Sequence, residues 1–308
     1  MDAQYDLIIV GAGPAGMTAG VYGARGGLNV LMLEPQAPGG KLVKTFEICN
    51  WPGYQTITGV QLAMDMFDHA TSAGTQYAYG QVKQIKPLNP GFEVICDDQT
   101  YTSKAVILAT GTVEKTLDLE GEAALIGRGV SFCAVCDGAF YKDKVVTVIG
   151  GGNSALEEAV YLTQFASKVY IVIRRDVFRA DPAAVKTVEN NPKIEVIVFH
   201  VPHEYQQQDG KVSGLVLKHV HDGSLKTIET DAVFPYIGQI PATESVVDLD
   251  VVNKDGYLLV NEKMETAIPG LFGAGDVCDK PLRQIVTATS DGAVAAQQAF
   301  HYIQQHFE

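Results

Sequence analysis

The chain has 308 residues, about the length of two domains, and is long enough to bury a core without disulfide support. It carries 23 Lys and Arg against 36 Asp and Glu, and this net charge of −13 would repel a phosphate backbone, so we expect no nucleic-acid partner. No apolar run approaches the ~20 residues that cross a bilayer, and the N-terminus lacks the basic region typical of a signal peptide, so we expect a cytoplasmic protein without membrane contact.

The N-terminal segment predicts a β-α-β unit: a buried strand over 5–10, the turn Gly11-Ala12-Gly13-Pro14-Ala15-Gly16, a helix over 17–25 and a strand over 29–33 that ends at Glu34. In such a turn Gly11 allows the tight bend, Gly13 the approach of a pyrophosphate and Gly16 close helix packing. The helix N-terminus offers N–H groups to phosphates, and Glu34 lies where a carboxylate can bind a ribose. The pattern predicts a dinucleotide site; a glycine-rich turn that only packs a helix is the alternative.

Strands are next predicted over 92–96 and 105–109, followed by a domain boundary near Thr112. The chain has an odd, sparse set of five cysteines, which is not a secreted disulfide framework: Cys49, Cys96, Cys133, Cys136 and Cys278.

Cys133 and Cys136 have C-x-x-C spacing and are followed by Asp137. We interpret the pair as a redox disulfide, because a thiolate in this motif can be stabilised by its surroundings. Half of a zinc site and two buried small side chains are the alternatives, but no second pair of cysteines supplies the remaining zinc ligands. Asp137 could move the proton that dithiol chemistry requires, or be an ordinary turn residue.

The β-α-β pattern recurs in the second half: a strand over 144–149, the turn Gly150-Gly151-Gly152-Asn153-Ser154-Ala155, a helix over 156–165 and a strand over 168–173. Three arginines follow the last strand, where the first unit has an acid: Arg174, Arg175 and Arg179. A guanidinium pairs bidentately with phosphate, so this turn predicts a 2′-phosphate, hence NADPH rather than NADH. A solvated basic turn is the alternative.

Further strands are predicted over 194–199, 212–219 and 232–237, with a second boundary near Ala242 and an amphipathic helix over 292–305. Between them, residues 271–277 predict a strand that ends at Asp276. An aspartate there could bind a polyol such as the ribityl chain of a flavin, or be a turn residue. The chain is therefore predicted to be α/β, with two nucleotide-binding units.

Together these motifs resemble the low-molecular-weight, bacterial-type thioredoxin reductases, pyridine nucleotide-disulfide oxidoreductases of class II. The matching segments run in family order over nearly the whole chain: Gly11–Gly16, Pro38–Gly40, Asn50–Gly53, Ala109–Gly111, Cys133–Gly138, Gly150–Ala155, Arg174-Arg175 with Arg179, Gly275–Val277 and Arg283-Gln284.

The resemblance implies two Rossmann-like domains: an FAD domain over 1–112 and 243–308, and an inserted NADPH domain over 113–242 that carries the disulfide. It also implies a homodimer that passes electrons from NADPH to FAD, to the cysteine pair and then to thioredoxin. By similarity, Cys136 faces the flavin, Cys133 attacks the partner disulfide and Asp137 is the general acid, while Asp276 and Gln284 contact the flavin.

The full set of cofactor-binding residues that these motifs and the resemblance imply is Gly11, Gly13, Pro14, Ala15, Gly16, Glu34, Gly40, Lys41, Leu42, Asn50, Ala109, Thr110, Gly111, Gly275, Asp276, Arg283 and Gln284 for FAD, and Gly150, Gly152, Asn153, Ser154, Arg174, Arg175 and Arg179 for NADPH. We expect no metal. Nicotinamide and disulfide must reach the flavin in turn, so we expect the inserted domain to rotate about hinges near Thr112 and Ala242.

Two positions depart from the family pattern. Ile173 stands where the family has His before the arginine pair, which weakens the NADPH preference, and Lys41 stands where it has Gln. Lys41 could shift the flavin potential or be a solvated lysine. Alternative functions are a reductase of another redoxin, a dithiol oxidase, a reductase with another electron donor, and a nucleotide-binding sensor without turnover.

Overall fold

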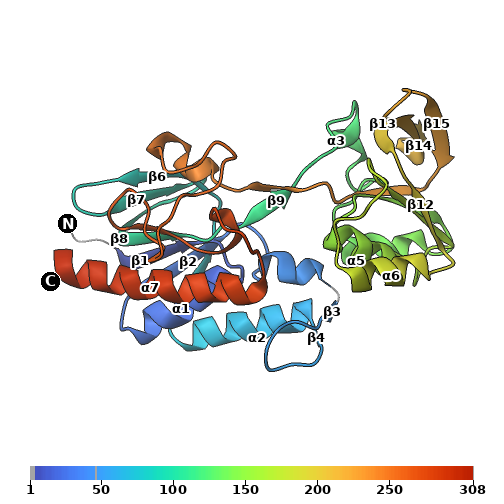
Figure 1. The fold of residues 1–308 in the computed structure, drawn as a ribbon. Helices are drawn as coiled ribbons and strands as arrows, with labels where there is room; N and C mark the ends of the chain where they lie inside the picture. The colour runs from blue at the N-terminus through green and yellow to red at the C-terminus, as the bar shows by residue number, and fades with distance from the viewer. Residues whose placement is uncertain (1–3, 46, 308) are drawn as a thin grey trace. The chain divides into compact units, whose positions relative to one another are not determined.

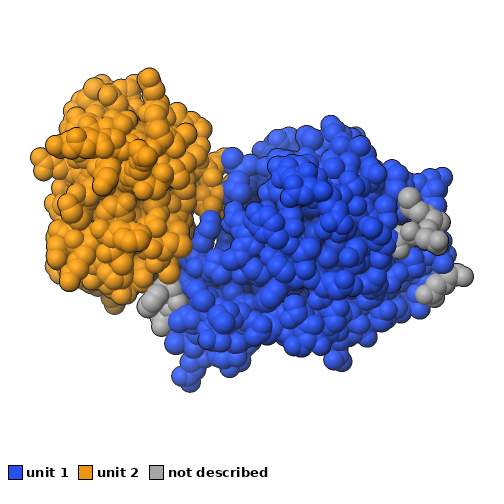
Figure 2. Space-filling model, turned by 180° about the vertical axis from the view of Figure 1, so that it is seen from behind, with its two compact units in different colours: residues 1–113, 240–308 blue, residues 114–239 orange. Residues whose placement is uncertain are grey.

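The computed structural model describes residues 4–45 and 47–307. The chain forms two compact units, one of Met1–Val113 with Ile240–Glu308 and one of Glu114–Gln239 (Figures 1 and 2). The second unit is thus an insertion into the first. The two chain segments that join the units pair with each other as the short strands β9 (Thr112–Glu114) and β17 (Gln239–Pro241). The predicted boundaries at 112 and 242 lie at or next to these strands.

The first unit is built on a seven-stranded sheet. Its spatial order is β5 (Gln76–Tyr79), β2 (Val30–Glu34), β1 (Tyr5–Val10), β8 (Thr100–Leu108), β7 (Phe92–Cys96) and β6 (Val82–Pro87), with β18 (Leu271–Gly273) paired to the end of β8. Alternate side chains of β1 enter two cores: Leu7 and Ile9 face the helices, while Ile8 and Val10 face the opposite side.

Three helices pack on the Leu7 face of this sheet: α1 (Pro14–Arg25), α2 (Gly59–Ser72) and α7 (Ile285–Phe307), as Figure 1 shows. The contact between α1 and α7 is made by small residues. A Cβ atom on Gly292 would lie 2.1 Å from the carbonyl oxygen of Ala15. The two helices therefore approach so closely that only glycine fits at this crossing.

The second unit contains a parallel sheet in the order β12 (Ile194–Ile197), β11 (Lys168–Val172), β10 (Val145–Ile149) and β16 (Ala232–Pro235). Helices α5 (Asn153–Leu162) and α6 (Pro182–Glu189) share one core with it, and the antiparallel sheet of β13 (His200–Gln208), β14 (Lys211–His219) and β15 (Leu225–Glu229) closes the other. The sheet of the first unit is mixed, with β6 and β7 antiparallel to an otherwise parallel set of strands. Each unit thus places a largely parallel sheet between two apolar layers, the expected arrangement for α/β proteins.

The remaining elements are short. They are β3 (Glu47–Ile48), β4 (Ile57–Thr58), α3 (Glu122–Leu125), α4 (Ala134–Asp137) and the 3-10 turns η1 (Gly40–Lys44), η2 (Gly138–Tyr141), η3 (Glu244–Leu249) and η4 (Gly275–Val277). Within the described residues, no helix is long and apolar enough to cross a bilayer.

The α/β class with two Rossmann-like units is confirmed, and each strand predicted from the sequence is present. The strand predicted over 105–109 begins earlier, at Thr100, and the one predicted over 271–277 ends at Gly273, which leaves Asp276 in the 3-10 turn η4. Three helix starts were wrong, and the helices predicted to end at 165 and 305 end at Leu162 and Phe307. The helices predicted at 17 and 156 begin at Pro14 and Asn153, because each glycine turn leads directly into its helix. The helix predicted over 292–305 begins at Ile285, because packing overrides the low helix propensity of β-branched residues.

We expect Gly292→Ala to destabilise the first unit by about 3 kcal/mol, because the added methyl group overlaps backbone atoms of α1 that cannot move aside. The thermal unfolding midpoint measures this loss. Gly80→Ala is the matched control in the same unit, since a Cβ atom there meets only side-chain atoms, none closer than 3.4 Å, and its φ is not positive. Equal midpoints for the two variants would contradict the close approach of the helices.

Candidate active site

The first glycine turn joins the end of β1 to α1. A Cβ on Gly11 would lie 2.4 Å from the Ala109 carbonyl oxygen, whereas a Cβ on Gly13 would point into open space. Gly13 is the N-cap of α1, with no side-chain cap, and Pro14 occupies the first turn, which contains no acidic residue. The helix therefore presents unpaired N–H groups and its positive dipole end to open space, which is the geometry of an anion site.

Glu34, at the end of β2, lies beside this turn. Its two carboxylate oxygens accept hydrogen bonds from the backbone N–H groups of Ala12, at 2.9 Å, and Gln36, at 3.0 Å. Burial raises the pKa of this carboxyl and the two hydrogen bonds partly oppose that shift. Each oxygen keeps a second lone pair, so the group can also accept hydrogen bonds from a ribose.

The segment around η1 packs over the same turn. The Gly39 N–H donates to the Ala12 carbonyl at 2.8 Å, and a Cβ on Gly40 would lie 3.3 Å from the Cα of Gly13. Leu42 is buried below. Further along, Asn50 Nδ2 donates to Gln284 Oε1 at 3.0 Å. The structure thus brings Gly40 to the glycine turn and joins Asn50 to Gln284, residues 234 positions apart in the sequence.

The predicted Ala109–Gly111 segment leaves the sheet at the end of β8. The Ala109 N–H donates to the Val10 carbonyl at 2.7 Å, and this hydrogen bond keeps the segment beside the first glycine turn. The Thr110 hydroxyl donates to the Ala242 carbonyl at 2.6 Å, and the Ala242 N–H donates to the Gly111 carbonyl at 3.0 Å. The outgoing and returning chains are therefore fastened together where the second unit is inserted.

The turn Gly275-Asp276 lies at the end of β18. Lys41 Nζ is 3.9 Å from Asp276 Oδ2 and donates to the Thr112 hydroxyl, so this lysine is part of the site and is not a freely solvated side chain. Arg283 donates to the carbonyl oxygens of Asp276, at 3.3 Å, and Cys278, at 3.1 Å. Arg283 therefore fixes the backbone of the turn rather than presenting a free cation.

The second glycine turn repeats the geometry of the first within the other unit. A Cβ on Gly150 would lie 2.2 Å from the Tyr236 carbonyl oxygen, and one on Gly152 would meet nothing within 4 Å. Gly152 is the N-cap of α5, again without a side-chain cap or an acidic residue in the first turn. Asn153 exchanges two hydrogen bonds with Asp181, of 2.7 and 2.8 Å, so its amide group holds a neighbouring loop, while Ser154 is exposed.

The three predicted arginines surround this second turn. The backbone N–H of Arg179 donates to the Gly151 carbonyl at 2.7 Å, so the loop that follows β11 is joined to the glycine turn. Arg174, Arg175 and Arg179 are exposed, and no group in the described residues forms an ion pair with any of them. Ile173 is buried against Gly151. The positive charge is therefore available to an anionic ligand.

The redox motif lies in the same unit. Cys133 and Cys136 form a disulfide, with Cα atoms 5.3 Å apart, so neither sulfur is available as a zinc ligand in this state. Cys133 is the N-cap of α4, and its Sγ accepts the N–H of Cys136 at 3.1 Å. This contact would stabilise a thiolate at Cys133 once the disulfide is reduced. Asp137 ends the same helix, half-buried.

Two groups near the disulfide were not predicted. The Tyr236 hydroxyl accepts the N–H of Ala134, the first residue of α4, at 3.3 Å. Glu158 lies on α5, which packs against α4, and its Oε2 is buried with no hydrogen-bond partner in the described part of the chain. Burial, and to a smaller extent the neighbouring Glu157, raise the pKa of Glu158 to about 7. No sequence motif marks either group, because each contact joins segments distant in the chain.

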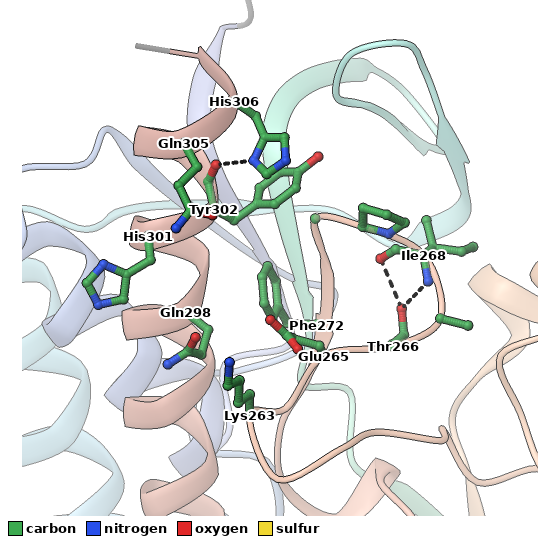
Figure 3. A pocket seen from close by; sticks show the side chains of 13 residues that line it. Lys263, Glu265, Thr266, Ile268, Phe272, Gln298, His301, Tyr302, Gln305 and His306 are labelled. Atoms are coloured by element: carbon green, nitrogen blue, oxygen red, sulfur yellow. Dashed lines mark hydrogen bonds between the residues drawn. The ribbon is translucent and has the colours of Figure 1, made fainter.

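A cavity of about 330 Å³ lies elsewhere, between residues 263–270 and the end of α7 (Figure 3). His306 stacks on Tyr302 there, with ring centroids 4.3 Å apart. None of the residues that line this cavity belongs to the predicted site.

Comparison with known proteins gives concordant matches. Residues 5–292 match the family model described as pyridine nucleotide-disulphide oxidoreductase. A thioredoxin reductase of Bacillus subtilis is 45% identical, over 98% of this chain and 95% of the relative, and one of Listeria monocytogenes is 44% identical, over 98% and 94%. The crystal structure of Lactococcus lactis thioredoxin reductase has a TM-score of 0.96 and 41% identity, and the match covers 98% of this chain and 100% of that one.

The raised pKa of Glu158 predicts a pH-dependent stability. The folded state binds this proton up to about pH 7 and the unfolded state only up to 4.5, so stability falls as the pH rises through this window, by about 3 kcal/mol in all. Glu158→Gln removes the titrating group and should flatten this part of the profile, measured as urea midpoints between about pH 4 and pH 8.

Glu204→Gln is the control for this experiment, because Glu204 is exposed in the same unit. It should keep the wild-type pH profile. A Glu158→Gln profile as steep as that of the wild type would show that this carboxyl ionises normally.

Proposed function

The chain belongs to the pyridine nucleotide-disulphide oxidoreductases and, within them, to the low-molecular-weight thioredoxin reductases, and we propose that it carries electrons from NADPH through FAD and the Cys133–Cys136 disulfide to thioredoxin. The observation that carries this proposal is the disulfide at a helix N-terminus, in the same unit as an uncapped glycine turn followed by exposed arginines that form no ion pair within the described part of the chain.

The first unit fits FAD. The open space above Gly13 and the uncapped α1 N-terminus suit the pyrophosphate, and the spare lone pairs of Glu34 suit the adenosine ribose. Asp276 would accept hydrogen bonds from the ribityl chain. We therefore assign residues 1–112 and 243–308 to FAD binding. The bound flavin would supply two-electron transfer between a nicotinamide and a disulfide.

The second unit, residues 113–242, fits NADPH. The Gly152 turn offers the same uncapped helix for the pyrophosphate, and Arg174, Arg175 and Arg179 offer guanidinium groups to the 2′-phosphate. Ile173 supplies packing but no hydrogen bond where the family has His.

Reduction of the disulfide breaks the S–S bond and adds two electrons and two protons to give two thiols. The N–H of Cys136 and the α4 N-terminus favour the thiolate form of Cys133. That thiolate attacks the thioredoxin disulfide to form a mixed disulfide, and Cys136 then attacks Cys133 Sγ, which releases dithiol thioredoxin and restores the Cys133–Cys136 bond. Asp137 exchanges the proton with the departing thiolate.

The oligomer and the partner surface are parts of the same proposal. Phe140, four residues after Cys136, is 80% exposed, and such an aromatic side chain beside a redox site suits a protein partner. Cys133 is only 9% exposed, so its surroundings must open before thioredoxin reaches it. We also propose the homodimer that the family resemblance implies, and a cytoplasmic location.

Under anaerobic conditions, NADPH should bleach the visible flavin band of the purified protein, and added thioredoxin should then gain thiols. Cys136→Ser should keep the bleaching but release no thiols at steady state, since Cys133 cannot be resolved. Absorbance and a thiol reagent report the two steps.

Cys49→Ser is the matched control, because Cys49 is an exposed free cysteine, and it should behave as wild type. A flavin that stays oxidised with NADPH but is reduced by a dithiol would overturn the proposal in favour of a dithiol oxidase or another electron donor.

Arg174→Ala and Arg175→Ala should each raise the KM for NADPH by about tenfold or more, because each removes a charge-assisted contact to the 2′-phosphate. The KM for NADH should hardly change, which separates this effect from general damage. Lys211→Ala, at an exposed lysine of the same unit, should alter neither constant. An equal rise for both nucleotides would refute 2′-phosphate recognition by these arginines.

A further inference from the structure

Lys280 and Asp291 form a buried ion pair beside the Gly275-Asp276 turn. Lys280 lies between η4 and α7, Asp291 lies near the start of α7, and both side chains are only 13% exposed. Asp291 Oδ2 accepts a hydrogen bond from Lys280 Nζ and another, of 3.0 Å, from the backbone N–H of Gly275. One carboxylate oxygen therefore connects α7, the loop and the first residue of the turn.

Packing alone does not call for charged side chains at this place. Burying an ion pair costs desolvation energy, and an apolar pair of similar volume is often as stable. An apolar pair cannot, however, accept the N–H of Gly275. That residue is buried with φ at +81°, and a buried N–H without an acceptor is costly. Asp291 thus contributes the hydrogen-bond acceptor for the Gly275 N–H, and Lys280 compensates the negative charge of Asp291.

The turn held in this way touches the first helix. A Cβ on Gly275 would lie 2.9 Å from Ala15 Cβ, and one on Gly292, next to Asp291, would lie 2.1 Å from the Ala15 carbonyl oxygen. Ala15 belongs to the first glycine turn. The ion pair therefore fastens the Asp276 turn to the helix that packs against the glycine turn, and so fixes two parts of the first unit relative to each other.

We propose that Asp291 and Lys280 are positioning residues that set the Asp276 carboxylate for the polyol chain of the flavin. This inference rests on the proposed function, since it requires FAD in the first unit. Asp291 acts through the Gly275 N–H and does not itself touch the cofactor. Neither residue belongs to a glycine, cysteine or arginine motif.

The test compares single and paired substitutions in the holoenzyme. Asp291→Leu alone leaves the Lys280 charge largely buried without its partner, whereas Asp291→Leu with Lys280→Met removes both charges and should recover part of the thermal midpoint that the single variant loses, the rest being the cost of the Gly275 N–H left without an acceptor. In both proteins the Gly275 N–H has lost its acceptor. FAD release on dilution, followed by the fluorescence of free FAD, should therefore be about tenfold faster in both, with a shifted visible flavin spectrum.

Asp279→Asn is the matched control, since Asp279 is an exposed acid of the same loop, and it should release FAD at the wild-type rate. If the paired variant recovers both its midpoint and its FAD retention, the ion pair is only structural and the inference is wrong. A wild-type protein that neither carries nor takes up FAD would instead overturn the proposed function.

Discussion

Close approach of a glycine to a neighbouring carbonyl oxygen, at the end of a central strand, is the constraint on which both nucleotide turns depend. Gly11 lies against Ala109 in the first unit, and Gly150 lies against Tyr236 in the second. A side chain at either position would push the turn away from the end of the neighbouring strand, β8 or β16. Each glycine turn leads directly into a helix, α1 or α5. Neither helix N-terminus has a side-chain cap, so its N–H groups are open toward a phosphate group.

Charge is distributed differently at the two turns, although the whole chain is strongly acidic at −13. Beside the Asp276 turn of the first unit two lysines lie near acids: Lys41 is close to Asp276, and Lys280 pairs with Asp291. In the second unit the arginines after β11 form no ion pair with any acid among residues 4–45 and 47–307. The first arrangement suits a cofactor that stays bound through many shape-specific contacts, and the second suits one recognised by its extra phosphate.

Local motifs predicted well those parts whose residues are contiguous. The glycine turns, the strands that precede them and the Cys133–Cys136 pair follow from short-range rules for backbone and thiol chemistry. The start of α7 was missed, because its first turn is rich in β-branched residues and its helical form depends on packing. Asp291 was missed for a related reason: its partner N–H lies 16 residues earlier and carries no side-chain signal.

The sequence alone determined the α/β class, the two nucleotide turns and the redox pair, because each is specified by residues that are neighbours in the chain and obey strong steric or chemical rules. Tertiary structure alone decided which side chains surround them. Arg283 became a support for a turn, Lys41 a partner of Asp276, and Glu158 a buried acid beside the disulfide helix. Burial and contact geometry set these roles, and both depend on segments that only folding brings together.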